Sequence, residues 1–105
     1  MGELEQLILL TVLRLGDDAY GVPILEGLET KANRRLSRGA LYTALDRLEA
    51  KGLLKSRLGE ALAERGGRPR RYYQVSARGL QALANARRTL LDLWRGVEND
   101  LAGAQ

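Results

Sequence analysis

A strongly basic, turn-rich segment that runs directly into a short strand restricts the fold of this chain more than any other feature. From Gly66 to Val75 the sequence is GGRPRRYYQV. Glycine and proline favour turns, whereas aromatic and β-branched residues favour strands. We therefore predict a β-hairpin whose strands span Leu53–Leu58 and Arg70–Val75. The intervening loop, Gly59–Pro69, is long for a hairpin, and loops of this length are usually functional or mobile.

The helix before this hairpin has the clearest boundaries in the sequence. Ser37 is a good N-cap residue, and Gly52 is well suited to end the helix. Apolar residues at helical spacing define a side that faces the core: Leu41, Ala44, Leu45 and Leu48. Residues opposite the core, or beside the helix start, are free to meet a ligand: Arg38, Gly39, Tyr42, Thr43, Asp46 and Arg47.

The order of the predicted elements is typical of a winged helix-turn-helix. In that fold a helix enters a DNA groove and a hairpin contacts the phosphate backbone beside it. Two helices, over about 3–15 and 23–31, precede the capped helix, and a last helix starts at Ser76. We therefore predict a mainly α fold with a small β-hairpin. Residues 1–75 would form the winged helix-turn-helix and residues 76–105 a C-terminal dimerisation helix, within one compact domain.

The charge distribution favours a nucleic-acid partner. The chain has 17 Lys and Arg against 13 Asp and Glu, a net charge of +4. Residues 31–71 hold twelve basic and four acidic side chains, a net +8, which leaves −4 for the rest of the chain. A region that is basic only around the predicted helix and hairpin is suited to phosphate. A surface that is basic only for solubility would intersperse both signs more evenly.

The predicted contacts to double-stranded DNA come from the capped helix and the hairpin. Recognition helices contact base edges mainly through their N-terminal residues, and basic hairpin tips meet phosphate. The predicted residues are Ser37, Arg38, Gly39, Tyr42, Thr43 and Arg47 from the helix, and Arg65, Arg68 and Arg70 from the hairpin. Tyr42 has an alternative role as a half-buried flanking residue that uses its hydroxyl as a polar handle. The hairpin tip has the alternative of a solvated loop.

The last helix presents an apolar seam at steps of three and four residues. The seam runs through Leu80, Leu83, Arg87, Leu90, Trp94, Val97 and Leu101, with Arg87 as a charged interruption. No other segment is left over to cover it, and the first helix is also apolar on nearly every side. We therefore predict a homodimer, with Leu83, Leu90, Trp94, Val97 and Leu101 as its contacts. The alternative is that part of the seam packs on the protein's own first helix.

Trp94 is the only tryptophan of the chain. Two-fold symmetry would bring it near its mate, and two wide, flat rings facing across a cavity would form a slot for a planar aromatic ligand. Trp94 is therefore a candidate ligand-binding residue. The alternative, favoured for aromatic residues at core spacing, is that it only fills the dimer core.

The absence of cysteine and histidine excludes several classes of chemistry. Disulfides, thiolate or imidazole metal sites, and Cys–His or Ser–His–Asp catalysis all need one of these residues. Asp17 and Asp18 lie in a predicted turn without a nucleophile, so we expect no enzyme activity, cofactor or metal. The apolar run Leu4–Leu15 is too short and interrupted to span a membrane, and the chain starts acidic rather than with a basic leader. We expect a cytoplasmic protein.

Two sequence blocks resemble the PadR family of bacterial transcriptional regulators. They are LYTALDRLEAKGLL from Leu41 to Leu54 and GRPRRYYQVSARG from Gly67 to Gly79, and Tyr20-Gly21 also matches. The single short C-terminal helix is similar to that of the family's compact subgroup. The resemblance implies a homodimeric winged-helix repressor whose dimer is built by the first and last helices. It also implies DNA contacts for Tyr42, Arg68 and Arg70.

The chain departs from the family pattern on the predicted recognition helix. The family commonly has Pro where this chain has Thr43, and Thr where it has Ala40; Pro23 also replaces a larger polar or aromatic residue. The operator sequence therefore does not follow from relatives. Some compact PadR-like regulators bind drug-like molecules between facing tryptophans, which favours the ligand role of Trp94. The remaining alternative to DNA binding is a winged-helix module whose basic face meets an acidic protein partner.

Overall fold

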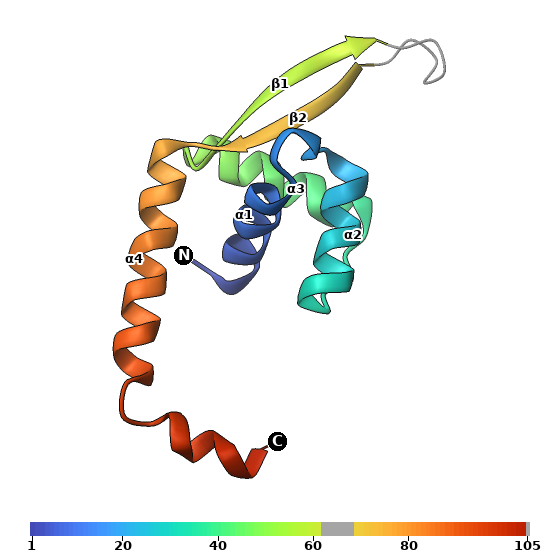
Figure 1. Cartoon of the computed structure of the whole chain (residues 1–105). Helices are drawn as coiled ribbons and strands as arrows, with labels where there is room; N and C mark the ends of the chain where they lie inside the picture. Colours follow the sequence, from blue (N-terminus) through green and yellow to red (C-terminus); the bar gives the residue numbers. More distant parts are fainter. Residues whose placement is uncertain (62–68, 105) are drawn as a thin grey trace.

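The helices and hairpin follow one another in the predicted order. The computed structural model describes residues 1–61 and 69–104. Its elements are α1 (Glu3–Leu15), the 3-10 turn η1 (Gly16–Asp18), α2 (Gly21–Ala32), α3 (Arg38–Ala50), β1 (Leu54–Ala61), β2 (Pro69–Val75), α4 (Ala77–Trp94) and the 3-10 segment η3 (Glu98–Ala104). Figure 1 shows α1, α2 and α3 grouped beneath the hairpin, with α4 leading away from them. The predicted winged-helix architecture is confirmed.

One apolar core holds the three N-terminal helices and the base of the hairpin together. Its buried residues are Ile8, Leu9, Val12, Ala19, Ile24, Leu28, Leu41, Leu45, Leu48, Leu53, Leu54, Tyr73, Val75 and Leu83. On α1 the opposite side is uncovered, since Leu10 and Leu13 are 46% and 45% exposed. Helix α1 therefore has two apolar sides. The core of the chain covers one of them, and the other is exposed.

The boundaries of α3 follow from its capping residues. The Ser37 hydroxyl oxygen accepts a hydrogen bond from the backbone N–H of Ala40 at 3.1 Å, which satisfies one of the free donors at the helix start. Gly52 follows the helix with a φ of 78°, a conformation that favours glycine. Leu41, Leu45 and Leu48 are fully buried, as the spacing predicts. Helix α2 begins at Gly21, two residues before the predicted start at Pro23.

Strand β1 starts one residue after the predicted Leu53 and runs to Ala61, and β2 starts at Pro69, so positions 59–61 and 69 of the predicted loop belong to strands. The strands are antiparallel, with Leu54 opposite Val75 and Arg57 opposite Tyr72, and the pairing becomes irregular between Leu58 and Ala61. The outer edge of β2 is not free at its base, because the N–H of Tyr73 donates to the carbonyl of Ala19 at 2.8 Å. Tyr73 itself is buried, and burial raises the pKa of its phenol. The hairpin is thus attached to the helices as well as to itself.

A tight junction sets the direction in which α4 leaves the hairpin. The carbonyl of Leu53 accepts from the Ser76 N–H at 3.1 Å, and the Ser76 hydroxyl donates to the Gly52 carbonyl at 2.6 Å. The same hydroxyl oxygen caps α4 by accepting from the Gly79 N–H at 3.0 Å. A Cβ atom at Gly79 would overlap the Leu53 carbonyl oxygen, so α4 can start here only because position 79 has no side chain.

The end of α4 differs from the prediction. The helix stops at Trp94, whereas the seam predicted a continuous helix through Leu101. Gly96 adopts a φ of 88°, which interrupts helical geometry, and Leu101 belongs to η3 instead. Leu83, one of the predicted dimer contacts, is only 9% exposed and belongs to the core of the single chain. Burial of Leu83 agrees with the alternative that part of the seam packs within its own chain.

None of the helices in residues 1–61 and 69–104 combines the length and apolar character that crossing a bilayer requires.

Replacing Gly79 by valine should destabilise the protein strongly. The new side chain would collide with the Leu53 carbonyl and with Val75, so the expected loss is about 2–4 kcal/mol of the free energy of unfolding. Urea denaturation followed by circular dichroism measures this loss. Gly39→Ala is the control, because nothing lies within 4 Å of a Cβ at that position apart from its own helix backbone. Equal stability of Gly79→Val and the wild type would contradict the proposed role of the junction.

Candidate nucleic-acid interface

An open groove lies between the starts of α2 and α3 and the hairpin. Its volume is about 610 Å³. The lining residues come from all three elements and are Tyr20, Gly21, Val22, Arg38, Tyr42, Leu58, Pro69, Arg70 and Arg71. Three of the predicted DNA contacts, Arg38, Tyr42 and Arg70, therefore line one groove although the first and last are 32 positions apart in the sequence.

Tyr42 lies across the start of α2. A Cβ atom at Gly21 would overlap the Tyr42 hydroxyl, so the missing side chain at position 21 makes room for this ring. Tyr42 nevertheless remains 44% exposed. Its environment fits both predicted roles, since the hydroxyl end packs against α2 at Gly21 while the side chain stays partly exposed and lines the groove.

The first turns of α3 present an open polar surface. Ser37, Arg38, Gly39 and Thr43 are exposed, and nothing within the described chain requires glycine at position 39. A helix start without a side chain at this point lets another backbone approach closely. The free N–H groups and dipole of the helix start also favour a negatively charged ligand. Arg47 is exposed in the last turn of the same helix.

The arginines of the hairpin are held by aromatic rings and hydroxyls. The guanidinium of Arg70 lies over the Tyr20 ring, 4.2 Å from its centre, and that of Arg57 lies 4.8 Å from the centre of the Tyr72 ring. Arg71 donates to the Ser56 hydroxyl oxygen at 2.9 Å, and Ser56 in turn donates to the Glu49 carboxylate of α3.

The roles of Tyr20, Arg57 and Arg71 in this site were not predicted from the sequence. The two-residue alternation of a strand places Arg70 and Tyr72 on one side of β2, and this signal could have linked those two. Nothing in the sequence indicates that Tyr20 joins them. Arg65 and Arg68, both predicted to contact DNA, lie outside the described residues.

The basic residues of segment 31–71 divide into paired and unpaired groups. Arg34 pairs with Glu3 at 2.7 Å, Arg35 with Glu29 at 2.8 Å, and Lys51 with Glu5 at 2.5 Å. The hydrogen bond from Lys51 lowers the pKa of the Glu5 carboxyl. Three of the basic side chains that give residues 31–71 their net positive charge are thus already paired with carboxylates of the same chain.

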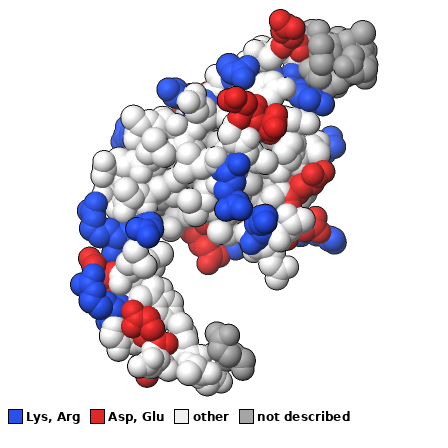
Figure 2. Space-filling view, in the orientation of Figure 1, with Lys and Arg blue, Asp and Glu red and all other residues white. Residues whose placement is uncertain are grey.

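The groove arginines belong to the unpaired group. Within residues 1–61 and 69–104, the groove arginines Arg38, Arg70 and Arg71 have no carboxylate at ion-pair distance, and Arg47 in the last turn of α3 has none either. Figure 2 shows acidic and basic side chains mixed on the visible face, so the overall surface is not uniformly positive. The arginines that line the groove therefore keep their positive charge available to a ligand, whereas Arg34, Arg35 and Lys51 are neutralised by carboxylates of the same chain.

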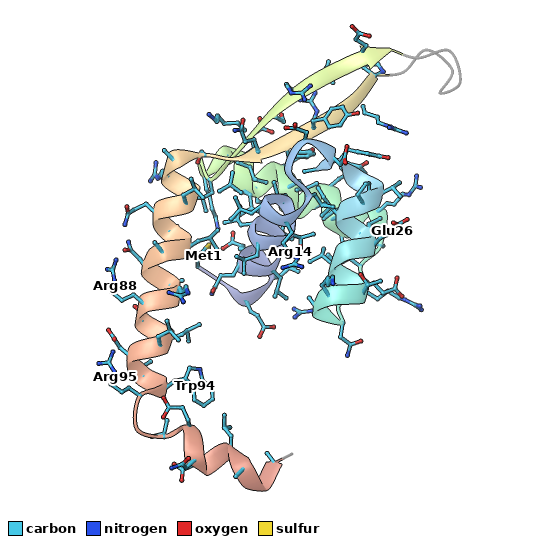
Figure 3. The ribbon with its side chains drawn as sticks, in the orientation of Figure 1. Met1, Arg14, Glu26, Arg88, Trp94 and Arg95 are labelled. Atoms are coloured by element: carbon cyan, nitrogen blue, oxygen red, sulfur yellow. The ribbon has the colours of Figure 1, made fainter. Side chains whose placement is uncertain are left out.

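A second exposed feature is the arm formed by α4 and η3. Its uncovered large apolar side chains are Leu80, Leu90, Leu91, Leu93, Trp94, Val97 and Leu101, with exposed fractions between 41% and 71%. Figure 3 shows Trp94 on the side of α4 that faces the helical body, and Arg88 and Arg95 on the opposite side. The arm is thus amphipathic, and its apolar side has no cover within the described chain.

A family model matches most of the chain. The model describes the transcriptional regulator PadR-like family and matches residues 9–85, which include the groove residues and the hairpin. The chain belongs to the PadR-like family of transcriptional regulators. Comparison with curated proteins gives no match.

Solved structures of PadR-family regulators agree with this assignment. A PadR family transcription regulator from Clostridium difficile is 26% identical with a TM-score of 0.71, and the match covers 95% of each chain. One from Eggerthella lenta is 29% identical with a TM-score of 0.69, over 95% of this chain and 87% of the other. A PadR-like regulator from Bacillus cereus, at 24% identity, has a TM-score of 0.74 over 94% and 91% of the two chains and supports the fold alone.

Proposed function

We propose that this PadR-like protein is a homodimeric, sequence-specific DNA-binding repressor that acts in the cytoplasm. The observation that supports it most is the groove in which Arg38 and Tyr42 of α3 meet Arg70 of the hairpin, with both arginines free of carboxylates in the described chain. In this proposal α3 enters the major groove and the hairpin follows the adjacent phosphates.

The proposed DNA contacts fall into two groups. Those on α3 would contact base edges and nearby phosphates: Ser37, Arg38, Gly39, Tyr42, Thr43 and Arg47. Those on the hairpin would contact the phosphate backbone of DNA. They are Arg70, which the structure describes, and Arg65 and Arg68, which lie outside the described residues. Base contacts determine sequence preference, whereas phosphate contacts add affinity for every sequence.

Removing Arg70 should therefore weaken binding to all duplexes alike. We expect Arg70→Ala to lose roughly tenfold in affinity and to reduce the salt slope by about 0.9 for each phosphate that it no longer neutralises. Arg38→Ala should change the preferred sequence as well. Fluorescence anisotropy with labelled duplexes, repeated at several salt concentrations, measures both effects.

Arg88→Ala is the matched control for this experiment. It removes the same charge from the outer side of α4, away from the groove, and should leave DNA binding unchanged (Figure 3). If Arg70→Ala and Arg88→Ala weaken binding equally, only net charge matters and the groove is not the interface. If the wild type binds an acidic protein segment but no duplex, the alternative of a protein-binding winged-helix module holds.

The proposed dimer is built on the apolar side of the arm, together with Leu10 and Leu13 of α1. Obligate interfaces resemble a protein core cut in half, and this surface has that composition. The proposed contacts on the arm are Leu90, Trp94, Val97 and Leu101. Such an interface would relate two grooves by two-fold symmetry, as palindromic operators require.

Introducing charge on this side should dissociate the dimer. We expect the double variant Leu90→Glu, Val97→Glu to raise the dissociation constant by at least about 100-fold, because two carboxylates would lose water without gaining partners. Analytical ultracentrifugation at micromolar concentration measures it. Arg88→Glu changes the charge by the same amount on the outer side and should remain a dimer. A compact, stable wild-type monomer at that concentration would disprove the proposal.

The exposed ring of Trp94 supports an additional proposal, that the dimer takes a planar aromatic effector. The ring is 42% exposed on the inner side of the arm, where its mate would face it. We expect a neutral three-ring aromatic dye to quench the fluorescence of this single tryptophan at micromolar concentration. The variant Trp94→Leu has no tryptophan to quench, so binding is measured there by the fluorescence polarisation of the dye. That polarisation should rise with the wild type and should not rise with the variant. Unchanged emission with normal DNA binding would leave Trp94 as a packing residue only.

A further inference from the structure

Four side chains along the hairpin and at the start of α2 form a continuous group of two tyrosine rings between two arginines. Arg57 lies over the Tyr72 ring at 4.8 Å, and Arg70 lies over the Tyr20 ring at 4.2 Å. The two rings meet edge to face, with centroids 5.6 Å apart and planes inclined by 66°. We call this group the Arg–Tyr ladder.

The ladder joins three elements that are anchored independently. Arg57 on β1 and Tyr72 on β2 are direct cross-strand partners, and Tyr20 is the N-cap residue of α2. The Tyr73 N–H holds the carbonyl of Ala19, so the backbone next to Tyr20 is fixed beside β2. The position of the Tyr20 ring is therefore determined by its backbone and by its contact with Tyr72.

Space for the ladder depends on a glycine of β1. A Cβ atom at Gly59 would lie 2.6 Å from a ring carbon of Tyr72, too close for a real contact. The Tyr72 ring thus packs over the strand at the point where the side chain is missing, and in this position it meets the Tyr20 ring edge to face.

Stacking uses the face of a guanidinium and leaves its N–H donors in the plane of the group. Arg70 is held in this way at the edge of the groove that Arg38 and Tyr42 also line. Within the described chain it has no carboxylate partner. A side chain that is ordered before binding loses less conformational entropy when it binds a phosphate.

We propose that Tyr20 is a positioning residue for DNA binding. Its ring holds the guanidinium of Arg70 at the groove, so that the free donors of that guanidinium meet a backbone phosphate of bound DNA. This inference rests on the proposed function, and it gives a role to a residue that need not contact DNA itself.

A double-mutant cycle tests the inference with the full chain and a random-sequence duplex. Tyr20→Leu removes the aromatic face and should weaken binding about 3- to 10-fold. Tyr20→Phe keeps the ring and should bind within about twofold of the wild type. Combined with Arg70→Ala, Tyr20→Leu should have no further effect, because the arginine that it positions is gone.

The cycle separates positioning from a general structural role. If Tyr20→Leu only loosened the fold, it would weaken binding to the same extent in the Arg70→Ala background, and additive losses would overturn the inference. Tighter binding by Tyr20→Leu would also overturn it, since the ring would then withhold Arg70 from DNA. Absence of salt-dependent duplex binding by the wild type would instead reject the proposed function, and the inference with it.

Discussion

The arrangement of groove, hairpin and arm depends on the contacts around one carbonyl group, that of Leu53. It accepts a hydrogen bond from Ser76 and lies against Gly79, so the end of α3, both strands and the start of α4 meet at one point. The connections on either side are short, because β1 starts four residues after α3 ends and α4 starts two residues after β2 ends. The angle between the groove and the arm is therefore set by local covalent geometry and close packing rather than by a flexible linker.

The groove combines residues that local structure orders with charges that the rest of the chain leaves free. Basic side chains near α1 and α2 form ion pairs, and exposed pairs of this kind contribute little to stability, generally below about 1 kcal/mol. Their effect here is selective, because they neutralise positive charge away from the groove. Arg70 is instead held by an aromatic face, which orders a cation without neutralising it. A net charge summed over the sequence cannot distinguish these two situations.

Local rules predicted most of the fold, and they failed where distant segments or a single backbone torsion decide the outcome. The cap at Ser37, the start of the last helix at Ser76 and the hairpin follow from short sequence patterns, and the structure confirms them. The seam of α4 was extended too far because apolar spacing continues across Gly96 while its backbone does not. The contact between Tyr20 and Arg70 spans 50 positions and has no sequence period, so it could not be predicted. The roles of the predicted DNA and dimer contacts remain predictions.

In the single chain, little apolar burial stabilises the arm. Only Gly79 and Leu83, near its start, are buried, whereas the residues from Leu90 onward face solvent. Isolated helices of this length are marginal in water, so the last turns of α4 gain little from their own hydrogen bonds. In the proposed dimer, burial of the apolar side would supply the missing stabilisation, and folding of the arm would then depend on protein concentration. Because the junction fixes the arm relative to the groove, ordering the arm would also fix the separation of the two grooves and hence the spacing of the two operator half-sites.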